Sequence, residues 1–362
     1  MKRIVLVGAG HAHLVALRSF VEQPLYGARL VLVTPQAGQI YSGMLPGLIA
    51  GHYALDEAQI DVAELCRRSF VELAQGRVAA LDLAGRRVRL ADGSSLEYDL
   101  LSINAGSLCD VSLPGAGGAL PVKPFETFIA GLRTAVVDRV AIVGAGAAGS
   151  ELAMALAHRG AAVTLYAGTP TLSPPLGQRV ARALRRATVD FRPGMAVSAI
   201  EEGPSVVAGA SRQEFSAVLL ATGAVALPWL SQSGLATDES GFVLVQDTLQ
   251  STSHPEVFAV GDCATLQSAP HPRSGVYAVR HGEILAQNLR RLLKPEPPLP
   301  YEPQRKALLL VSCGARYAIA ERGTFTAEGR WAWKLKDWID RRWVASFSKA
   351  HRIDGAPAST DS

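Results

Sequence analysis

The chain has 362 residues, of which 48% are hydrophobic and 19% charged, and its formal net charge at pH 7 is +4. This composition is typical of a globular protein of two or three domains, and so small a net charge argues against a nucleic-acid partner. Between residues 290 and 352, fourteen Lys and Arg stand against six Asp and Glu, so the positive charge is concentrated in the C-terminal part.

The cysteines and apolar runs bear on the compartment. The four cysteines stand singly, at Cys66, Cys109, Cys263 and Cys313, which predicts neither a disulfide framework nor a metal site. The start, MKRIVLVGAGHAHLVAL, resembles a signal peptide, but glycines and histidines interrupt it, and a strand entering a glycine turn explains it better. The longest apolar run, residues 217–230, is shorter than the ~20 residues of a spanning helix. We expect a cytoplasmic protein.

The first predicted elements form a βαβ unit. Strands are expected at residues 3–7 and 28–34, with a helix at 10–22 between them, and such units give parallel strands. Residues 77–103 change to short alternating strands, with a hairpin turn in which Gly93 takes a positive φ.

A second βαβ unit is expected further along the chain. Strands at 139–143 and 162–167 flank a helix at 146–159. The remaining expectations are strands leading into turns near 217–224 and 257–262, a helix at 275–293, a proline-rich break at 294–303, a final α+β portion and a disordered tail at 351–362.

Each unit has a glycine-rich turn between strand and helix, GAGHAH at 8–13 and GAGAAG at 144–149. In a dinucleotide-binding unit the first glycine makes the tight turn, the second lets the backbone approach a pyrophosphate, and the third lets helix and strand pack closely. The phosphates then bind at the helix N-terminus. Both contexts fit, so the sequence predicts two dinucleotide sites that include Gly8, Gly10, Gly144, Gly146 and Gly149.

Both turns depart from the full pattern. His13 replaces the third glycine of the first turn, and neither following strand ends in the acidic residue that holds a ribose. Thr34 stands at that place in the first unit and offers a hydroxyl, whereas Ala167 and Gly168 stand there in the second. The choice between NAD and NADP stays open.

With an ATG-type turn at 221–223 and VFAVGD at 257–262, the two units resemble flavoproteins with two dinucleotide-binding domains. That superfamily includes disulfide reductases, sulfide:quinone reductases and type II NADH dehydrogenases. The resemblance covers residues 1–350. It implies that the first unit binds FAD through Asp262, among others, and that the second binds NAD(P)H. The fold it implies is α/β, with two nested Rossmann-like domains: an FAD domain at 1–110 and 215–293, an NAD(P) domain at 111–214, and a small α+β portion with an amphipathic helix at 294–350.

Two further segments narrow the resemblance. YSGMLPGLIAGHY at 41–53 lacks the cysteine pair of disulfide reductases and is similar to the flavin-flanking segment of type II NADH dehydrogenases, and LPVKPFETFIAGLR at 120–133 resembles their linker. VGAGHAH, YSGMLPGLIAGHY, PVKP, GVYAVR and WAWKLKDWIDRRW together resemble the flavoprotein module often fused upstream of selenide, water dikinase. The implied cofactor contacts further include Thr34, Tyr41, Pro46, Ala105, Gly106, Thr222, Gly223 and Gly261.

The resemblance also suggests catalytic residues. Lys123 and Glu151 are expected to pair beside the flavin; the alternative is a surface lysine and a glutamate stabilised by a helix dipole. Arg280 and His281 replace a glutamine pair and offer a cation to reduced flavin or to an acceptor; the alternative is that they are solvated.

His11 and His13 are the remaining candidates near the first turn. We expect them close to the phosphates of noncovalently bound FAD. The alternatives are a covalent flavin bond and simple packing at the joint between strand and helix.

Four of the five tryptophans lie between Trp331 and Trp343. At helical spacing one stripe contains Trp331, Leu335, Trp338, Ile339 and Trp343, and Lys334, Lys336, Arg341 and Arg342 lie beside or opposite it. Trp with Lys and Arg suits a membrane interface, and the alternative is packing on the protein's own core or on a partner. The first reading puts the protein on the inner face of the cell membrane.

The leading hypothesis is an FAD-dependent oxidoreductase that passes electrons from NAD(P)H to a quinone-like or small-molecule acceptor, with no metal. One alternative is redox chemistry of sulfur or selenium compounds with Cys313 or Cys109 at the flavin. The other is a redox-responsive flavoprotein without turnover, which docks on selenide, water dikinase or a membrane.

Overall fold

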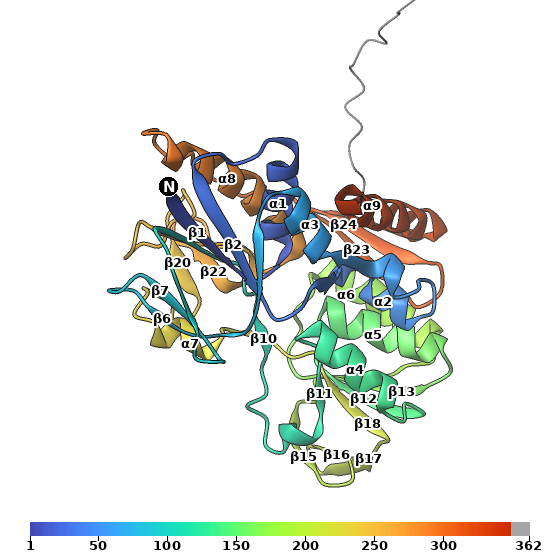
Figure 1. Ribbon diagram of the computed structural model, residues 1–362. Coiled ribbons are helices and arrows are strands. Elements are labelled where there is room, and N and C mark those ends of the chain that lie inside the picture. The colour runs from blue at the N-terminus through green and yellow to red at the C-terminus, as the bar shows by residue number, and fades with distance from the viewer. Residues whose placement is uncertain (349–362) are drawn as a thin grey trace, which may run out of the picture.

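The first of two parallel sheets presents the first glycine turn at the carboxyl ends of its strands. A computed structural model describes residues 1–348 of the protein (Figure 1). The strand order is β21-β9-β1-β2-β5, all parallel. The strands are β1 (Lys2–Val7), β2 (Ala28–Thr34), β5 (Glu72–Gln75), β9 (Leu100–Ile103) and β21 (Val257–Ala259). The sheet is therefore built from two separated parts of the sequence.

Helices cover this sheet. The predicted first helix is confirmed as α1 (His11–Glu22), and the predicted helix at 275–293 as α8 (Gly275–Leu293). The two pack closely because a Cβ at Gly282 would lie 2.4 Å from the carbonyl oxygen of Ala12. Parallel strands buried on both faces are largely apolar, as in residues 4–7 of β1.

The second sheet has the order β11-β18-β12-β13-β14, again all parallel. Its strands are β11 (Leu120–Pro121), β12 (Arg139–Val143), β13 (Ala162–Ala167), β14 (Asp190–Pro193) and β18 (Ala217–Leu220). Its helices are α4 (Phe125–Thr134), α5 (Ala147–His158) and α6 (Pro174–Arg186). The expected α/β fold of two Rossmann-like units is confirmed. Since β18 pairs with β12, this sheet extends past the boundary predicted at residue 214.

Small sheets, antiparallel except for the parallel pair β20-β22, and short helices fill the connections. The expected hairpin joins β7 (Arg87–Leu90) to β8 (Ser95–Glu97), with Gly93 at φ 89°. The other strands are β3 (Gly38–Ile40), β4 (Gln59–Asp61), β6 (Val78–Asp82), β10 (Leu108–Cys109), β15 (Val197–Glu201), β16 (Ser205–Ala208), β17 (Ser211–Glu214), β19 (Ala224–Val225), β20 (Val243–Val245) and β22 (Ala264–Leu266). The short helices are α2 (Leu45–Ile49), α3 (Val62–Arg68) and α7 (Pro228–Gln232).

The C-terminal portion is a three-stranded antiparallel sheet followed by a long helix. The strands are β23 (Leu308–Ser312), β24 (Ala318–Arg322) and β25 (Phe325–Gly329), and the helix is α9 (Arg330–Ser348). This sheet lies between α9 and helices α5 and α6 (Figure 1). No helix among residues 1–348 is both long and apolar enough to cross a bilayer. The tail predicted at 351–362 lies outside the described residues.

Candidate cofactor-binding site

Asn104 ties together three turns at the carboxyl ends of β1, β9 and β21. Its side-chain oxygen accepts a hydrogen bond from the backbone N–H of His13 (3.1 Å), and its side-chain nitrogen donates to the carbonyl of Val260 (2.8 Å). A Cβ at Gly10 or at Gly261 would lie 2.5 Å from this side chain. Asn104 was missed by the sequence analysis, although it stands directly before two predicted contacts, Ala105 and Gly106.

The first glycine turn has the geometry expected of a phosphate-binding turn. Gly8 has φ 89°, and its N–H donates to the carbonyl of Val33 (2.7 Å). Helix α1 begins after Gly10 with neither a side-chain cap nor an acidic residue in its first turn. The N–H groups of such a helix end suit an anion.

The two histidines of this turn have different environments. His13 is fully buried, with Nδ1 2.6 Å from the carbonyl of Gly8 and Nε2 2.8 Å from the Ser102 hydroxyl, and burial lowers its pKa to about 4. Because both ring nitrogens are used inside the protein, the side chain of His13 packs at the joint between strand and helix, and the prediction that this residue lies near the phosphates of FAD stays a prediction.

His11 lies on the open side of the turn. Its ring centroid is 5.4 Å from that of Tyr41 and 6.1 Å from that of Trp343. Its Nε2 is buried without a hydrogen-bond partner among residues 1–348. Burial lowers the pKa of His11, and nearby Asp262 opposes that shift. An orphaned buried nitrogen of this kind fits a site that a polar ligand completes.

Lys123 and Asp262 form an ion pair across the two units. The ammonium nitrogen of Lys123 lies 2.8 Å from a carboxylate oxygen of Asp262 and 2.9 Å from the hydroxyl of Ser107. The expected pairing of Lys123 with Glu151 is therefore wrong. Gly261, with φ 69°, is in the left-handed region that favours glycine, and it sets the direction of Asp262.

Glu151 points instead toward the C-terminal portion. Its carboxylate accepts a hydrogen bond from the N–H of Ser312 (2.7 Å). Burial raises the pKa of Glu151 to about 7, and Lys336 opposes part of that rise. A carboxyl group with such a pKa exchanges protons near neutral pH.

Helix α9 contributes a buried ion pair to this region. The ammonium nitrogen of Lys336 lies 2.6 Å from a carboxylate oxygen of Asp340 and 2.6 Å from the carbonyl of Gly43. The side chain of Lys336 is only 10% exposed, so this lysine does not belong to the exposed cations of α9.

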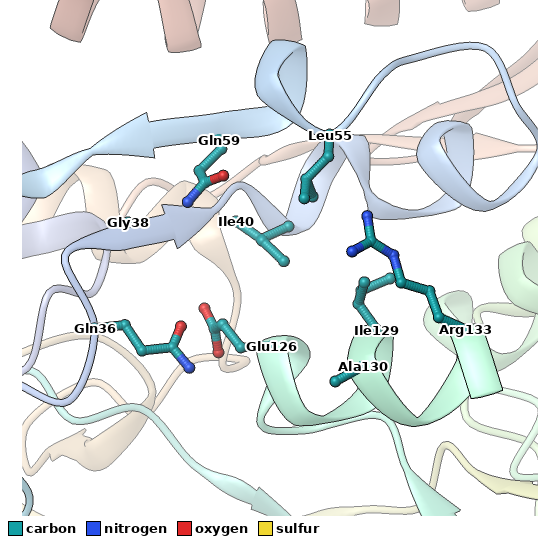
Figure 2. Close-up of a pocket in the computed structure, with 9 residues that line it drawn as sticks. All are labelled: Gln36, Gly38, Ile40, Leu55, Gln59, Glu126, Ile129, Ala130 and Arg133. Carbon is teal, nitrogen blue, oxygen red and sulfur yellow. The ribbon is translucent and has the colours of Figure 1, made fainter.

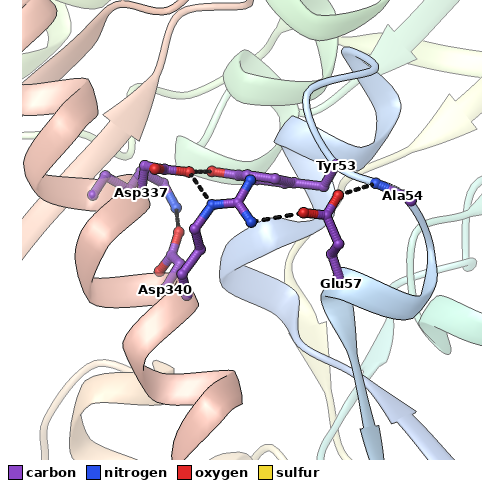
Figure 3. Close-up of polar contacts among 7 residues, drawn as sticks. Tyr53, Ala54, Glu57, Asp337 and Asp340 are labelled. Carbon is purple, nitrogen blue, oxygen red and sulfur yellow. Dashed lines mark hydrogen bonds and ion pairs between the residues drawn. The ribbon is translucent and has the colours of Figure 1, made fainter.

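A second group of contacts anchors α9 to residues 53–57 (Figure 3). Tyr53 donates to Asp337 (2.8 Å), and Glu57 accepts from the N–H of Ala54 (2.8 Å). Arg341 joins the two carboxylates, at 3.0 Å from Asp337 and 2.7 Å from Glu57. Together with the Lys336–Gly43 contact, these contacts fix α9 to the chain on both sides of α2.

Arg280 and His281 have different environments. Arg280 is exposed and pairs with Glu283 at 3.0 Å. His281 is 1% exposed, and burial lowers its pKa to about 3, which disfavours a cation at this position. The expected role of Arg280 toward reduced flavin or an acceptor stays a prediction.

The second glycine turn is complete. A Cβ at Gly144 would lie 2.3 Å from the carbonyl oxygen of Ala221, and one at Gly149 would lie 1.8 Å from that of Gly144. Helix α5 begins after Gly146 with neither a side-chain cap nor an acidic residue in its first turn. The turn is therefore suited to a second pyrophosphate.

The other predicted contacts lie around the two turns. The hydroxyl of Thr222 donates to the carbonyl of Asp110 (2.7 Å). This bond joins the two segments that connect one parallel sheet to the other. A Cβ at Gly106 or Gly223 would meet only open space. Thr34 and Pro46 are buried, at the end of β2 and in α2.

A cavity of about 190 Å³, open to solvent, lies between β3, β4 and α4 (Figure 2). It is lined by Gln36, Gly38, Ile40, Leu55, Gln59, Glu126, Ile129, Ala130 and Arg133. It shares no residue with the predicted site. Asp262 and the start of α8 border a gap that is too narrow to hold a water molecule.

The cysteines give no sign of thiolate chemistry. All four are buried, and burial raises the pKa of Cys313 to about 12. Within residues 1–348, no three His, Cys, Asp or Glu side chains gather as metal ligands would.

Known proteins resemble this chain in sequence and fold. A probable ferredoxin reductase of Castellaniella defragrans is 29% identical over 278 residues, which cover 72% of this chain and 67% of that protein. An NADH dehydrogenase-like protein of Mycobacterium tuberculosis is 26% identical, covering 79% of this chain and 78% of that protein. The fold also matches NDH2 of Plasmodium falciparum in complex with NADH, with a TM-score of 0.80 at 11% identity over 96% of this chain and 98% of that one.

A protein-family comparison gives the assignment. Residues 2–282 match the family model described as pyridine nucleotide-disulphide oxidoreductase. The match spans both glycine turns, the Lys123–Asp262 pair and His281. The chain therefore belongs to the pyridine nucleotide-disulphide oxidoreductase family.

Proposed function

We propose that the protein is an FAD-dependent oxidoreductase that takes electrons from NAD(P)H and passes them to a quinone-like or other small-molecule acceptor. The single observation that carries the proposal is the Lys123–Asp262 pair. It joins the turn at Gly261–Asp262 in the first unit, called the GD turn below, to the segment that enters the second unit. The family and its NADH dehydrogenase-like relative support the same cofactors.

The residues of the first unit fit FAD. The uncapped start of α1 suits the pyrophosphate, and Asp262 with the orphaned Nε2 of His11 offers polar partners beside it. When bound, FAD would supply the two-electron chemistry by accepting hydride from the nicotinamide and passing electrons on. Lys123 fixes Asp262 and places a positive charge there, and the rings of Tyr41 and Trp343 cover His11.

Glu151 is our candidate for the proton that a quinone-like acceptor takes up. Its pKa of about 7 lets the carboxyl group hold a proton and release it in the neutral range. Lys336 and Asp340 lie near it and form a closed ion pair, so they set the field at Glu151 without themselves being free.

We also propose that the exposed face of α9 rests on a membrane. Trp331 and Trp338 are 51% and 57% exposed, and the guanidinium of Arg342 lies 5.4 Å from the ring centre of Trp338. Lys334 is exposed between them. Exposed indoles with neighbouring cations suit the headgroup region of an anionic bilayer. The predicted stripe is divided, since Trp343 packs against Phe347 and His11.

A visible spectrum under anaerobic conditions tests the proposed function. A flavin spectrum that bleaches on addition of NADH or NADPH, and returns on addition of a soluble quinone, is the expected result. A protein without flavin, or a flavin that neither nucleotide reduces, would overturn it. The predicted association with selenide, water dikinase has no support in these contacts and stays a prediction.

A further inference from the structure

A chain of hydrogen bonds runs from the GD turn through two histidines to the loop before α8. The N–H of Gly261 donates to Nδ1 of His281 (3.0 Å). Nε2 of His281 lies 3.2 Å from Nε2 of His271, and Nδ1 of His271 lies 3.2 Å from the carbonyl of Pro272. These contacts connect the backbone next to Asp262 with a segment near the protein surface.

One arrangement of protons satisfies all three contacts. Because the N–H of Gly261 is a donor, Nδ1 of His281 must accept, and a neutral His281 then has its proton on Nε2. That proton is donated to Nε2 of His271, which must therefore have its own proton on Nδ1 and donate it to Pro272. Both rings are neutral in this arrangement.

Aromatic rings hold the two imidazoles in place. The ring of His271 stacks on that of Tyr277 with centroids 4.2 Å apart, and the ring of His281 meets that of Tyr301 edge-on at 4.5 Å. His281 is buried, whereas His271 is half-buried. The rings therefore have little freedom to turn and form other hydrogen bonds.

The charges around the pair do not favour a proton on it. Asp262, from the GD turn, is the one acid that raises the pKa of His281, and it is already paired with Lys123. Arg273, from the loop before α8, lowers the pKa of His271. Burial raises the pKa of Tyr301 to about 12, and Arg280 of α8 is exposed.

We propose that His271 and His281 are positioning residues that hold the Gly261–Asp262 turn in its cofactor-binding geometry only while both are neutral. The inference rests on the proposed function, because it takes FAD as the ligand of Asp262. A proton added to either ring would turn one of its accepting nitrogens into a donor that faces another N–H.

The sign of the pH effect follows from linkage. In a loosened turn the rings titrate near the ordinary value of about 6.5, whereas in the held turn they stay neutral to lower pH. Protonation therefore favours the loosened turn, so FAD affinity is full at neutral and alkaline pH and weakens as the pH falls below about 6.5, by at most about tenfold per pH unit for each histidine. Burial also lowers the pKa of His11 and of His13, so these two histidines can add their own pH dependence to FAD binding. The contribution of His271 and His281 is therefore measured with variants.

The experiment is a titration of FAD-depleted full-length protein with FAD, followed by flavin fluorescence, at several values between about pH 8 and pH 5.5. Between about pH 8 and about pH 5.5, the FAD affinity of H271Q should fall about tenfold less than that of the wild type. The reason is that the Gln oxygen still accepts a hydrogen bond from His281 and does not titrate. H281L should weaken binding about tenfold even at about pH 8, because it leaves the Gly261 N–H without an acceptor. H281N should restore most of that loss by accepting from Gly261. H254Q, at a partly exposed histidine outside these contacts, is the matched control with the wild-type pH profile.

Two results would overturn the inference while FAD still binds. The first is that H271Q and H281N keep the full acid weakening of the wild type. The second is that H281L binds FAD as tightly as the wild type at high pH. If H281L does not fold, H281N and H271Q decide. Failure of every form to bind FAD at any pH would overturn the proposed function, and this inference with it.

Discussion

At the scale of single residues, the first turn depends on a polar contact that the glycine pattern does not contain. Asn104 leaves no room for a side chain at Gly10 or Gly261, and it joins α1 to the strand end before the GD turn. The glycine at position 10 is therefore required by a side chain of the same protein as well as by any ligand.

This predicts a coupling that stability measurements can detect. G10A should cost roughly 1–3 kcal/mol of unfolding free energy, because its methyl group displaces Asn104 from buried partners. In an N104A background the same change should cost less, and the difference is read from a double-mutant cycle in urea. G117A, where an added Cβ meets nothing within 4 Å, is the control. Additive costs would contradict the contact.

Glu151 gives a second prediction at this scale. E151Q should lower the turnover of a quinone acceptor by roughly 10²-fold or more, because the amide transfers no proton. Stopped-flow rates of flavin reduction and reoxidation locate the loss, which should fall in reoxidation. E239Q, at an exposed carboxylate, is the control. An unchanged reoxidation rate would remove Glu151 from the mechanism.

The same substitution tests the raised pKa of Glu151. A carboxyl group with a folded-state pKa of about 7 makes the protein less stable as pH rises from the unfolded-state value through 7. E151Q lacks that penalty, so its stability relative to the wild type should increase from about pH 5 to about pH 8. Urea unfolding at both values measures it, and a difference that is independent of pH would contradict it.

At the scale of elements, α9 has two faces with different chemistry. One face buries the Lys336–Asp340 pair against the loop before α2, and the other exposes Trp331, Lys334 and Trp338. Sequence periodicity identified the helix but did not separate Lys336 from the exposed cations. Lys336 can be buried because it has two partners, the carboxylate of Asp340 and the carbonyl of Gly43. Sequence spacing reveals the first partner but not the second.

The exposed face predicts binding to vesicles. Replacing Trp331 and Trp338 by Ser should strongly reduce sedimentation with anionic vesicles, and added salt should weaken binding of the wild type because cations contribute to it. Y26S, at an 83% exposed aromatic residue outside α9, is the control. Equal sedimentation of the wild type and the Trp331 and Trp338 variant would contradict the docking.

At the scale of the whole molecule, two sheets each present one uncapped helix start. Each ligand should therefore stabilise the protein separately. Removing FAD should lower Tm by several degrees, because a ligand at ~100 times its Kd contributes about 2.7 kcal/mol. NADH or NADPH should add a further shift in the FAD-loaded protein, measured by scanning calorimetry.

A variant of the second turn separates the two sites. Ala148 is exposed in the first turn of α5, where a carboxylate suits the helix dipole but repels a pyrophosphate. A148E should keep the FAD shift and lose the nucleotide shift. A nucleotide shift that persists in A148E would place that ligand elsewhere.

The sequence by itself determined the two βαβ units, the hairpin at Gly93 and the helix at 275–293, because these depend on local periodicity and on glycine at positive φ. It also identified Asp262 and both glycine turns. Only the tertiary structure decided that Lys123 pairs with Asp262, that Glu151 faces Ser312, and that His13 and His281 are buried and neutral. The physical reason is that the partners and the burial of a charged or titratable side chain depend on segments that meet only when the sheets are assembled; the partners of Lys123 and Glu151 are 139 and 161 residues away in the sequence.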